Sequence, residues 1–430
     1  MERSDIKLWL SRLRGLAVFR GILDAPGMRM TLNLLELLSE EKPDAGAVAE
    51  SYGLLWRELM DAPERPLPDA GRSYLVRTVL EDENTFALSA ERSALTPALV
   101  EQAQLELRLL SGLFDLEAAA LLRMVEKAAP DFEGFWTTPR FEPQQDVSPR
   151  RRATRMLADA ADWGDCAEGL AEHFAAHGAG AFGRHAAFRW RDGRLFAVPH
   201  PDTTRLGELV GYERERAPLV ANTERFLAGL PAHHALLYGP PGTGKSSTVK
   251  ALLNEYADRG LRLVELDKGD LGKLPEVLRV LDRRGPRFVL FVDDLSFEEH
   301  EVEYKRLKAF LEGSVEAPPA NVRLYATSNR RNIVRESFLD RDEDDVHARD
   351  TMQEKLSLSA RFGLRVTFPS PDQLRYLEIV SGLARQRGIK LAQGEVEDRA
   401  KLWDRWHAGR SGRTARQFVD ELQAQITEKQ

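Results

Sequence analysis

The sequence predicts an α/β fold in which a five-stranded parallel sheet is followed by a small helical lid and preceded by a mostly helical region. Apolar residues recur at three- and four-residue spacing up to about residue 129, and again after residue 371. Between these regions, short apolar runs alternate with helical patterns, which is typical of buried parallel strands whose sheet is covered by helices on both faces.

We expect the chain to divide into four parts, since a length of 430 residues favours more than one domain. They are a helical N-terminal region (1–129), a linker with a helix and a β-hairpin (130–205), the sheet domain (206–370) and the lid (371–430). The hairpin is predicted over Phe188–Val198, because polar and apolar residues alternate there around an Asp-Gly turn.

Composition narrows the classes of function. Hydrophobic residues make up 43% of the chain and charged residues 30%, which indicates globular domains with a polar surface. A net charge of -7 gives no overall attraction to nucleic acid. The single Cys166 excludes an internal disulfide, and no cysteine and histidine spacing suggests zinc. With no signal peptide and no run long enough to cross a bilayer, we expect a cytoplasmic protein without a membrane partner.

The runs predicted to form the parallel strands are 235–238, 261–266, 288–292, 322–326 and 364–368. The first leads directly into the loop Gly239-Pro240-Pro241-Gly242-Thr243-Gly244-Lys245-Ser246, and a helical pattern follows Ser247. This strand–loop–helix order is that of a P-loop, whose glycines let backbone N–H groups surround phosphate oxygens. We expect Lys245 to reach the β- and γ-phosphates of a nucleotide and Ser246 to bind its magnesium ion.

Polar side chains follow two of the other predicted strands. Asp293 and Asp294 come directly after residues 288–292, and Asn329 closely follows residues 322–326. Since parallel strands end at one edge of the sheet, these groups should lie beside the P-loop. We expect Asp293 to help hold magnesium, Asp294 to activate the attacking water, and Asn329 to bond the γ-phosphate or that water. Glu298 and Glu299 are the alternatives to Asp294.

Three arginines later in the chain complete the set of candidate site residues. Arg361 precedes the last predicted strand, and Arg413 and Arg416 lie about one helical turn apart in the lid. A guanidinium from the lid would be able to clamp phosphate oxygens.

The order of these motifs over residues 206–430 resembles the AAA+ ATPase superfamily. More narrowly, Gly211-Tyr212-Glu213, Asp293-Asp294-Leu295-Ser296-Phe297 and Ser357-Leu358-Ser359-Ala360-Arg361-Phe362-Gly363 are similar to a bacterial AAA+ family catalogued only as a domain of unknown function. The resemblance implies that the protein binds ATP with Mg²⁺ and hydrolyses it.

The resemblance also implies roles for individual residues. Gly211 and Tyr212 would lie near adenine, Asn329 would be the first sensor, and Arg413 the second sensor, with Arg416 as the alternative. Arg361 would be an arginine finger entering a neighbour's site, which implies a homo-oligomer. Because the superfamily usually has Glu at the position of Asp294, we expect slow hydrolysis.

Two functions remain open at this stage. The first is an oligomeric ATPase that remodels a protein or protein–nucleic-acid assembly whose client is not identified. The alternative is a nucleotide-controlled loader or switch acting on DNA, since Ser359–Leu364 resembles the finger segment of replication-initiator ATPases. Acidic net charge and the lack of a helix-turn-helix or zinc module disfavour the alternative. The segment Asp267–Leu274 lacks the aromatic residue that protein-threading relatives carry, which disfavours an unfoldase. A small-molecule kinase is also disfavoured, because kinases with this kind of P-loop lack the arginine series.

Overall fold

The computed structural model describes residues 3–62, 64–142, 148–297, 303–312, 318–329, 358–406 and 409–428. Contacts divide the chain into two compact units. Unit 1 comprises Met1–Arg184 together with Arg283–Pro286, and unit 2 comprises His185–Asp282 and Arg287–Gln430. Each unit is described by itself below.

Unit 1 is built from helices, as the apolar spacing of the sequence predicts. Side chains at the N-caps help to start several of them: Asp44, Asp69, Asn84 and Thr96 each accept a hydrogen bond from the backbone N–H three residues later. The helices are α1 (Arg3–Arg14), α2 (Pro26–Leu38), α3 (Ala45–Met60), α4 (Ala70–Glu81), α5 (Thr85–Glu91), α6 (Pro97–Phe114), α7 (Ala118–Ala128), α8 (Pro149–Asp159), α9 (Ala167–His177) and α10 (Gly180–Arg184). Short 3₁₀ turns lie at Arg20–Asp24, Pro130–Phe132 and Trp163–Cys166.

The core of unit 1 is apolar but also holds the buried carboxylates of Glu91 and Glu106. Glu106 of α6 is buried, and its two oxygens accept hydrogen bonds from the backbone N–H groups of Ala17, Val18 and Phe19 at 2.9–3.1 Å. The side chain of Gln102 donates to the same group at 2.8 Å. These donors replace the water that a buried carboxylate loses, so Glu106 fixes the chain after α1 with both of its oxygens hydrogen-bonded.

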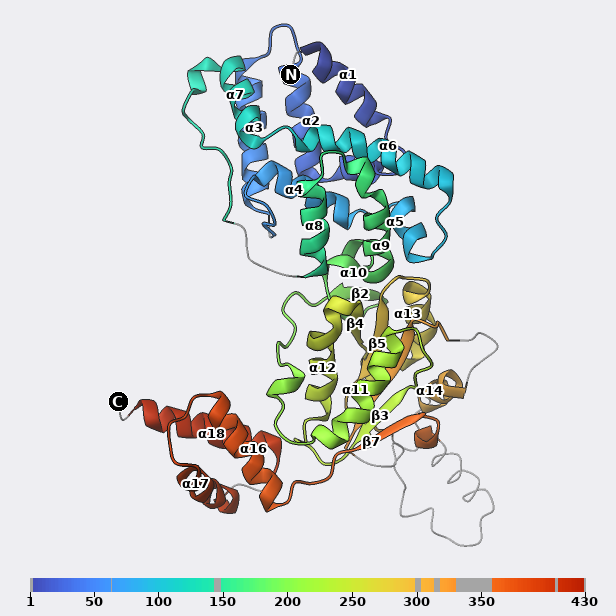
Figure 1. The fold of residues 1–430 in the computed structure, drawn as a ribbon, viewed down its shortest axis with the longest axis vertical. Coiled ribbons are helices and arrows are strands. Elements are labelled where there is room, and N and C mark those ends of the chain that lie inside the picture. The colour runs from blue at the N-terminus through green and yellow to red at the C-terminus, as the bar shows by residue number, and fades with distance from the viewer. Residues whose placement is uncertain are drawn as a thin grey trace. The chain divides into compact units, whose positions relative to one another are not determined.

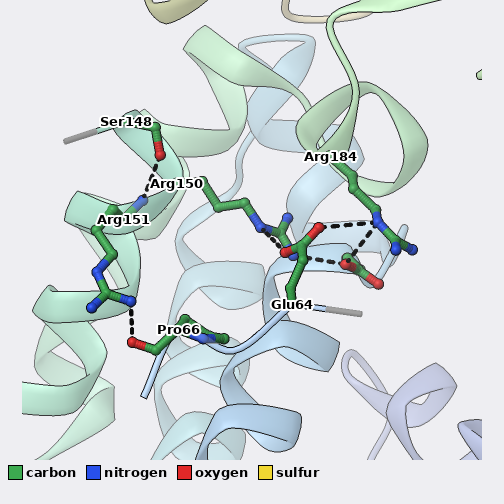
Figure 2. A network of polar contacts seen from close by, with 7 residues as sticks. Glu64, Pro66, Ser148, Arg150, Arg151 and Arg184 are labelled. Atoms are coloured by element: carbon green, nitrogen blue, oxygen red, sulfur yellow. Dashed lines mark hydrogen bonds and ion pairs between the residues drawn. The ribbon is translucent and has the colours of Figure 1, made fainter. Parts of the chain in front are cut away.

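A polar network joins the start of α8 to earlier parts of unit 1, and Figure 2 shows Arg150 and Arg184 converging on Glu64. Nε of Arg150 donates to Glu64 at 3.0 Å, and Nε of Arg184 donates to the other oxygen at 3.1 Å. Arg150 also donates to Glu81 at 2.7 Å. Because these four side chains are at most one third exposed, the network contributes more than isolated surface pairs do.

Unit 2 contains a seven-stranded sheet with the order β2-β1-β4-β5-β6-β3-β7. The strands are β1 (Ala187–Arg191), β2 (Arg194–Ala197), β3 (Ala235–Tyr238), β4 (Leu261–Glu265), β5 (Arg287–Val292), β6 (Val322–Ser328) and β7 (Leu364–Thr367). β3 to β7 are the five predicted strands, and neighbouring strands among them pair in parallel. The predicted α/β fold with a parallel sheet is therefore confirmed.

The predicted hairpin is also confirmed, and it extends the sheet. β1 and β2 pair antiparallel around Asp192 and Gly193, which have φ angles of 50° and 74°, as a two-residue hairpin turn requires. On its other side β1 pairs in parallel with β4. The burial of Phe188 and Trp190 explains why the hairpin joins the sheet: these side chains contribute apolar surface that a free hairpin would leave in water.

Helices cover the sheet of unit 2, and in Figure 1 α12 lies to one side of the strand labels and α13 and α14 to the other. The helices of the sheet region are α11 (Glu213–Leu227), α12 (Lys245–Tyr256), α13 (Leu274–Leu281) and α14 (Glu303–Glu312). 3₁₀ turns lie at Leu206–Glu208, Ala257–Arg259 and Lys268–Lys273.

The C-terminal helices form the predicted helical lid, drawn in orange to red in Figure 1. They are α16 (Gln373–Gln386), α17 (Gln393–Trp406) and α18 (Gly412–Thr427), and each contacts the other two. The side chain of Ser411 accepts a hydrogen bond from the N–H of Thr414 and starts α18. Within the described ranges, no helix combines the length and the apolar character needed to span a membrane.

Candidate nucleotide-binding site

The P-loop joins β3 to α12, and its glycines adopt conformations that other residues avoid. Gly242 and Gly244 have φ angles of 77° and 90°. A Cβ atom at Gly239 would lie 2.0 Å from the carbonyl oxygen of Phe368, so this position has no room for a side chain. Such a turn directs backbone N–H groups and the N-terminus of α12 toward one point, which suits an anion.

Lys245 is the first residue of α12, and its amine lies inside the loop. Nζ donates to the carbonyl oxygens of Gly239 and Pro240 at 2.7 and 2.9 Å, and to Oδ1 of Asn329 at 3.1 Å. Burial lowers the pKa of Lys245, and the nearby Asp294 and Asp293 act in the opposite direction. The amine is thus a desolvated cation, and its attraction to phosphate oxygens is stronger than in water.

Ser246 and Asp293, the two residues predicted to hold magnesium, lie together. The hydroxyl of Ser246 donates to Oδ1 of Asp293 at 2.6 Å. The buried hydroxyl of Thr327 on β6 donates to the same carboxylate oxygen. A serine hydroxyl and a carboxylate are ligands that Mg²⁺ prefers, so this pair fits the ion that accompanies a nucleotide.

Asp294 and Asn329 face each other across the ends of β5 and β6. Nδ2 of Asn329 donates to Oδ1 of Asp294 at 2.6 Å, while the amide oxygen of Asn329 accepts from Lys245. Asp294 has a φ angle of 51°, and its N–H donates to the hydroxyl of Thr327 at 2.9 Å. That bond holds the backbone at a left-handed angle that a non-glycine residue seldom adopts.

The lid reaches the P-loop through the start of α18. The N–H of Gly412 donates to the carbonyl oxygen of Gly242 at 2.8 Å. Arg413 and Arg416, one turn apart on α18, both line the cleft between the P-loop and the lid. Both candidates for the second sensor therefore border the same cleft.

The cleft has a volume of about 460 Å³, which is within the range of small-molecule sites. One end is polar, and is formed by the P-loop from Pro241 onward, Asp293, Asp294 and Asn329. The other end is largely apolar, with Leu209, Val210, Tyr212, Ile379 and Leu383 in its lining. This division would suit a nucleotide with its phosphates at the polar end and its base at the apolar end.

Gly211 and Tyr212 lie beside the apolar end. Tyr212 lines the cleft, and its hydroxyl donates to the carbonyl oxygen of Pro369 at 2.7 Å. Burial raises the pKa of this hydroxyl. Gly211 has a φ angle of 76° and packs near Ile379 of the lid, where an added Cβ atom would lie 3.2 Å away.

Arg361 is not among the residues that line this cleft. Its guanidinium forms an ion pair with Glu312 at the end of α14. Phe362, the next residue, is buried and anchors the segment before β7. β7 is an edge strand paired with β3, so Arg361 lies at the sheet edge next to the P-loop strand. Glu298 and Glu299, the alternatives to Asp294, lie outside the described residues.

Sequence reasoning missed several residues of the site, among them Thr327 and Arg216. Thr327 lies in the segment that includes Asn329, but a threonine inside an apolar strand carries no signal of its own. Arg216 lines the cleft from α11, and its guanidinium donates to the carbonyl oxygens of Leu209 and Gly211. A helical arginine usually lies at the surface, so only its three-dimensional contacts identify it.

The chain has several partial relatives. It is 34% identical over 77 residues to a replication factor C large subunit of Staphylothermus marinus, covering 18% of each chain. It is 29% identical over 147 residues to a 26S proteasome regulatory subunit 6B homolog of Schizosaccharomyces pombe, covering 29% of this chain and 38% of the relative.

Solved structures of Thermotoga maritima RuvB, a Holliday junction branch migration motor, match with a TM-score of 0.36 and 19% identity, over 52% of this chain and 65% of RuvB. This chain thus spans less than two thirds of each of these three proteins.

The family match is broader than any of these. The family described as "Protein of unknown function (DUF815)" matches residues 183–426. That range contains the whole P-loop, both aspartates after β5, Asn329, Arg361 and nearly all of the lid, and it covers more than half of the chain. This protein therefore belongs to the DUF815 family.

Proposed function

We propose that this protein hydrolyses ATP, with Mg²⁺, as an oligomer that remodels a protein or protein–nucleic-acid assembly. One observation supports this proposal above all: five polar residues meet at the polar end of one cleft, with hydrogen bonds of 2.6–3.1 Å among them. They are Lys245, Ser246, Asp293, Asp294 and Asn329. Cation, hydroxyl, carboxylates and amide are the groups that phosphoryl transfer to water requires.

Each group has a distinct task in this proposal. Lys245 and the backbone N–H groups of the loop bind the β- and γ-phosphates, and Ser246 and Asp293 hold the ion, which neutralises phosphate charge when bound. Asp294 accepts a proton from the attacking water and Asn329 orients that water or the γ-phosphate. Arg413 or Arg416 contacts the phosphates from the lid.

Arg361 would act in a neighbouring subunit. It lies at the sheet edge and outside the cleft of its own chain, so its guanidinium would reach a nucleotide only if another copy presents one. Arginines that act in this way contribute roughly 10³–10⁵ in rate. A homo-oligomer with sites at subunit interfaces follows from this assignment.

Subunit mixing tests the assignment of Arg361. Arg361→Ala and Lys245→Ala proteins should each hydrolyse ATP poorly, whereas an equal mixture should regain part of the activity, since one interface can then combine an intact P-loop with an intact arginine. Arg365→Ala is the matched control, because Arg365 is exposed on β7 and is not a cleft residue. Folded, freely exchanging subunits that show no recovery would contradict action between subunits.

A second candidate function is a nucleotide-controlled loader or switch acting on DNA. The short match to a replication factor C large subunit favours it over other classes of binding protein. Binding to single- and double-stranded DNA, measured at low and moderate salt with and without ATP, separates the two. An absence of binding at low salt would exclude the loader, because phosphate contacts are strongest there.

Other sequence-based expectations stay predictions. They are the four-part division at residues 129/130, 205/206 and 370/371, the cytoplasmic location, and the placement of Gly211 and Tyr212 near adenine. A protein client is best sought with an Asp294→Asn protein held in its ATP-bound state, followed by identification of what stays bound.

A further inference from the structure

Arg216 of α11 makes an unusual set of contacts for a helical arginine. It is only 7% exposed. Its Nη2 donates to the carbonyl oxygen of Leu209 at 2.8 Å, and its Nη1 donates to that of Gly211. Glu213 is a more distant partner, at 3.3 Å from Nη2. The guanidinium thus holds the backbone on both sides of Val210.

The backbone held by Arg216 turns sharply at the entrance to α11. Gly211 and Tyr212 have φ angles of 76° and 63°, both in the left-handed region. For Tyr212 this conformation is unfavourable unless its surroundings impose it. Two hydrogen bonds from one planar, buried guanidinium are well suited to impose it, since their geometry is fixed by a single rigid group.

The same segment packs closely against the first helix of the lid. A Cβ atom at Gly382 of α16 would lie 2.5 Å from the side chain of Val210, so only glycine allows this approach. The side chain of Gln386 donates to the carbonyl oxygen of Glu208 at 3.1 Å. Ile379 and Leu383, on the same helix, line the apolar end of the cleft.

These contacts separate the cleft into two functional ends. The groups that suit phosphates and Mg²⁺ come from the P-loop and the ends of β5 and β6, whereas Leu209 and Val210 form an apolar wall together with Ile379 and Leu383 of the adjoining lid helix. A nucleobase is planar and has apolar faces, so it suits such a wall. Arg216 borders the cleft on the Leu209–Gly211 side and holds that segment through its two backbone hydrogen bonds.

We propose that Arg216 is a positioning residue for the nucleobase: it holds Leu209–Gly211 as the wall against which the base binds, and so sets the part of the affinity that the base contributes. The inference rests on the proposed binding of ATP in this cleft. Burial of the guanidinium, which lowers the pKa of Arg216, carries a desolvation cost, and the hydrogen bonds to Leu209 and Gly211 offset it only while the wall keeps this shape.

The test compares ATP with inorganic tripolyphosphate, which has the phosphates but no base. Lysine keeps the charge of Arg216 but lacks the planar fork that bridges two carbonyl groups. Arg216→Lys should therefore weaken ATP binding by about tenfold while leaving tripolyphosphate binding unchanged within about twofold. Arg214→Lys is the matched control, because Arg214 is exposed on the same helix and should change neither affinity.

A second variant covers the case in which Arg216→Lys does not fold, as judged by thermal unfolding. Gly382→Ala places a methyl group against Val210 from the lid and should also weaken ATP binding more than tripolyphosphate binding. Equal weakening of both ligands, or no change in either, would overturn the inference. A wild type that binds tripolyphosphate as tightly as ATP would also overturn it, while leaving the phosphate site intact. A wild type that binds neither ligand would overturn the proposed function itself.

Discussion

Replacement of Asp294 tests the chemistry of the site most directly. Its carboxylate accepts a hydrogen bond from Asn329 at 2.6 Å, and its backbone is held by Thr327. Asparagine has nearly the same shape and keeps an oxygen that can accept the bond from Asn329. Asp294→Asn therefore removes the charge and the ability to take a proton while the surrounding geometry stays.

The expected size of the effect follows from the role of the carboxylate. A general base contributes about 10²–10⁴ in rate, so Asp294→Asn should lower kcat by about two orders of magnitude or more, with ATP affinity largely unchanged. Asp294→Glu should act in the opposite direction. It extends the carboxylate by one methylene toward the cleft, and because a misplacement of about 1 Å can cost about 10²-fold, kcat should rise by roughly tenfold to a hundredfold.

The assay measures steady-state phosphate release together with equilibrium binding of ATP in the presence of Mg²⁺. Binding serves as the control, since a misfolded variant would lose both properties. If Asp294→Asn keeps wild-type turnover while binding ATP normally, Asp294 is not the base, and Glu298 or Glu299 takes that role. If Asp294→Glu instead lowers kcat, the length of the Asp294 side chain is not what slows hydrolysis.

Three further changes have defined outcomes. Lys245→Ala should remove most ATP affinity, measured by calorimetry, because backbone donors alone do not replace the desolvated charge; unchanged affinity in a folded variant contradicts the assignment. Thr327→Val should lower turnover by about tenfold, since the N–H of Asp294 and the carboxylate of Asp293 both lose a partner; a rate equal to wild type would mean that the hydroxyl is dispensable. Burial lowers the pKa of His234 to about 4, and Arg323 and His233 act in the same direction. As the pH falls below about 6.5, the histidine is therefore protonated in the unfolded chain but stays neutral in the native state. This residue should cost about 2 kcal/mol of stability between pH 7 and pH 5, and denaturant unfolding of His234→Gln should show a correspondingly smaller loss than wild type.

The sequence predicted the sheet and its functional edge because both have strong local signals. Five apolar runs were long enough, and sufficiently bounded by helical patterns, to be recognised as buried strands, and the structure has strands at all five places. The P-loop needs glycine at fixed positions for steric reasons, as Gly239 illustrates. Because parallel strands end at the same edge, the proximity of Asp293 and Asn329 to Lys245 followed from topology alone.

Other features depend on contacts between distant segments and have no local signal. The hairpin was evident from its Asp-Gly turn, but the pairing of β1 with β4 depends on the open edge that β4 offers. Thr327 acts only because its strand brings the hydroxyl to Asp293 and Asp294. The contact of Gly412 with Gly242 requires the lid to fold back over the P-loop, which spacing along the chain does not reveal.

The hydrogen bonds within the site explain how a set of charges can be held ready for a nucleotide. Lys245 donates to two loop carbonyls and to Asn329, and Ser246 donates to Asp293, so each polar group already has a protein partner. In the proposed function, a bound nucleotide would exchange these partners for phosphate oxygens and Mg²⁺ instead of ordering flexible side chains, which would reduce the entropy lost on binding. Asn329 is central to the exchange because its amide bonds both Lys245 and Asp294. When Lys245 turns to the phosphates, the amide oxygen of Asn329 loses one partner while its Nδ2 still donates to Asp294, so the position of the proposed base depends on occupancy at the P-loop.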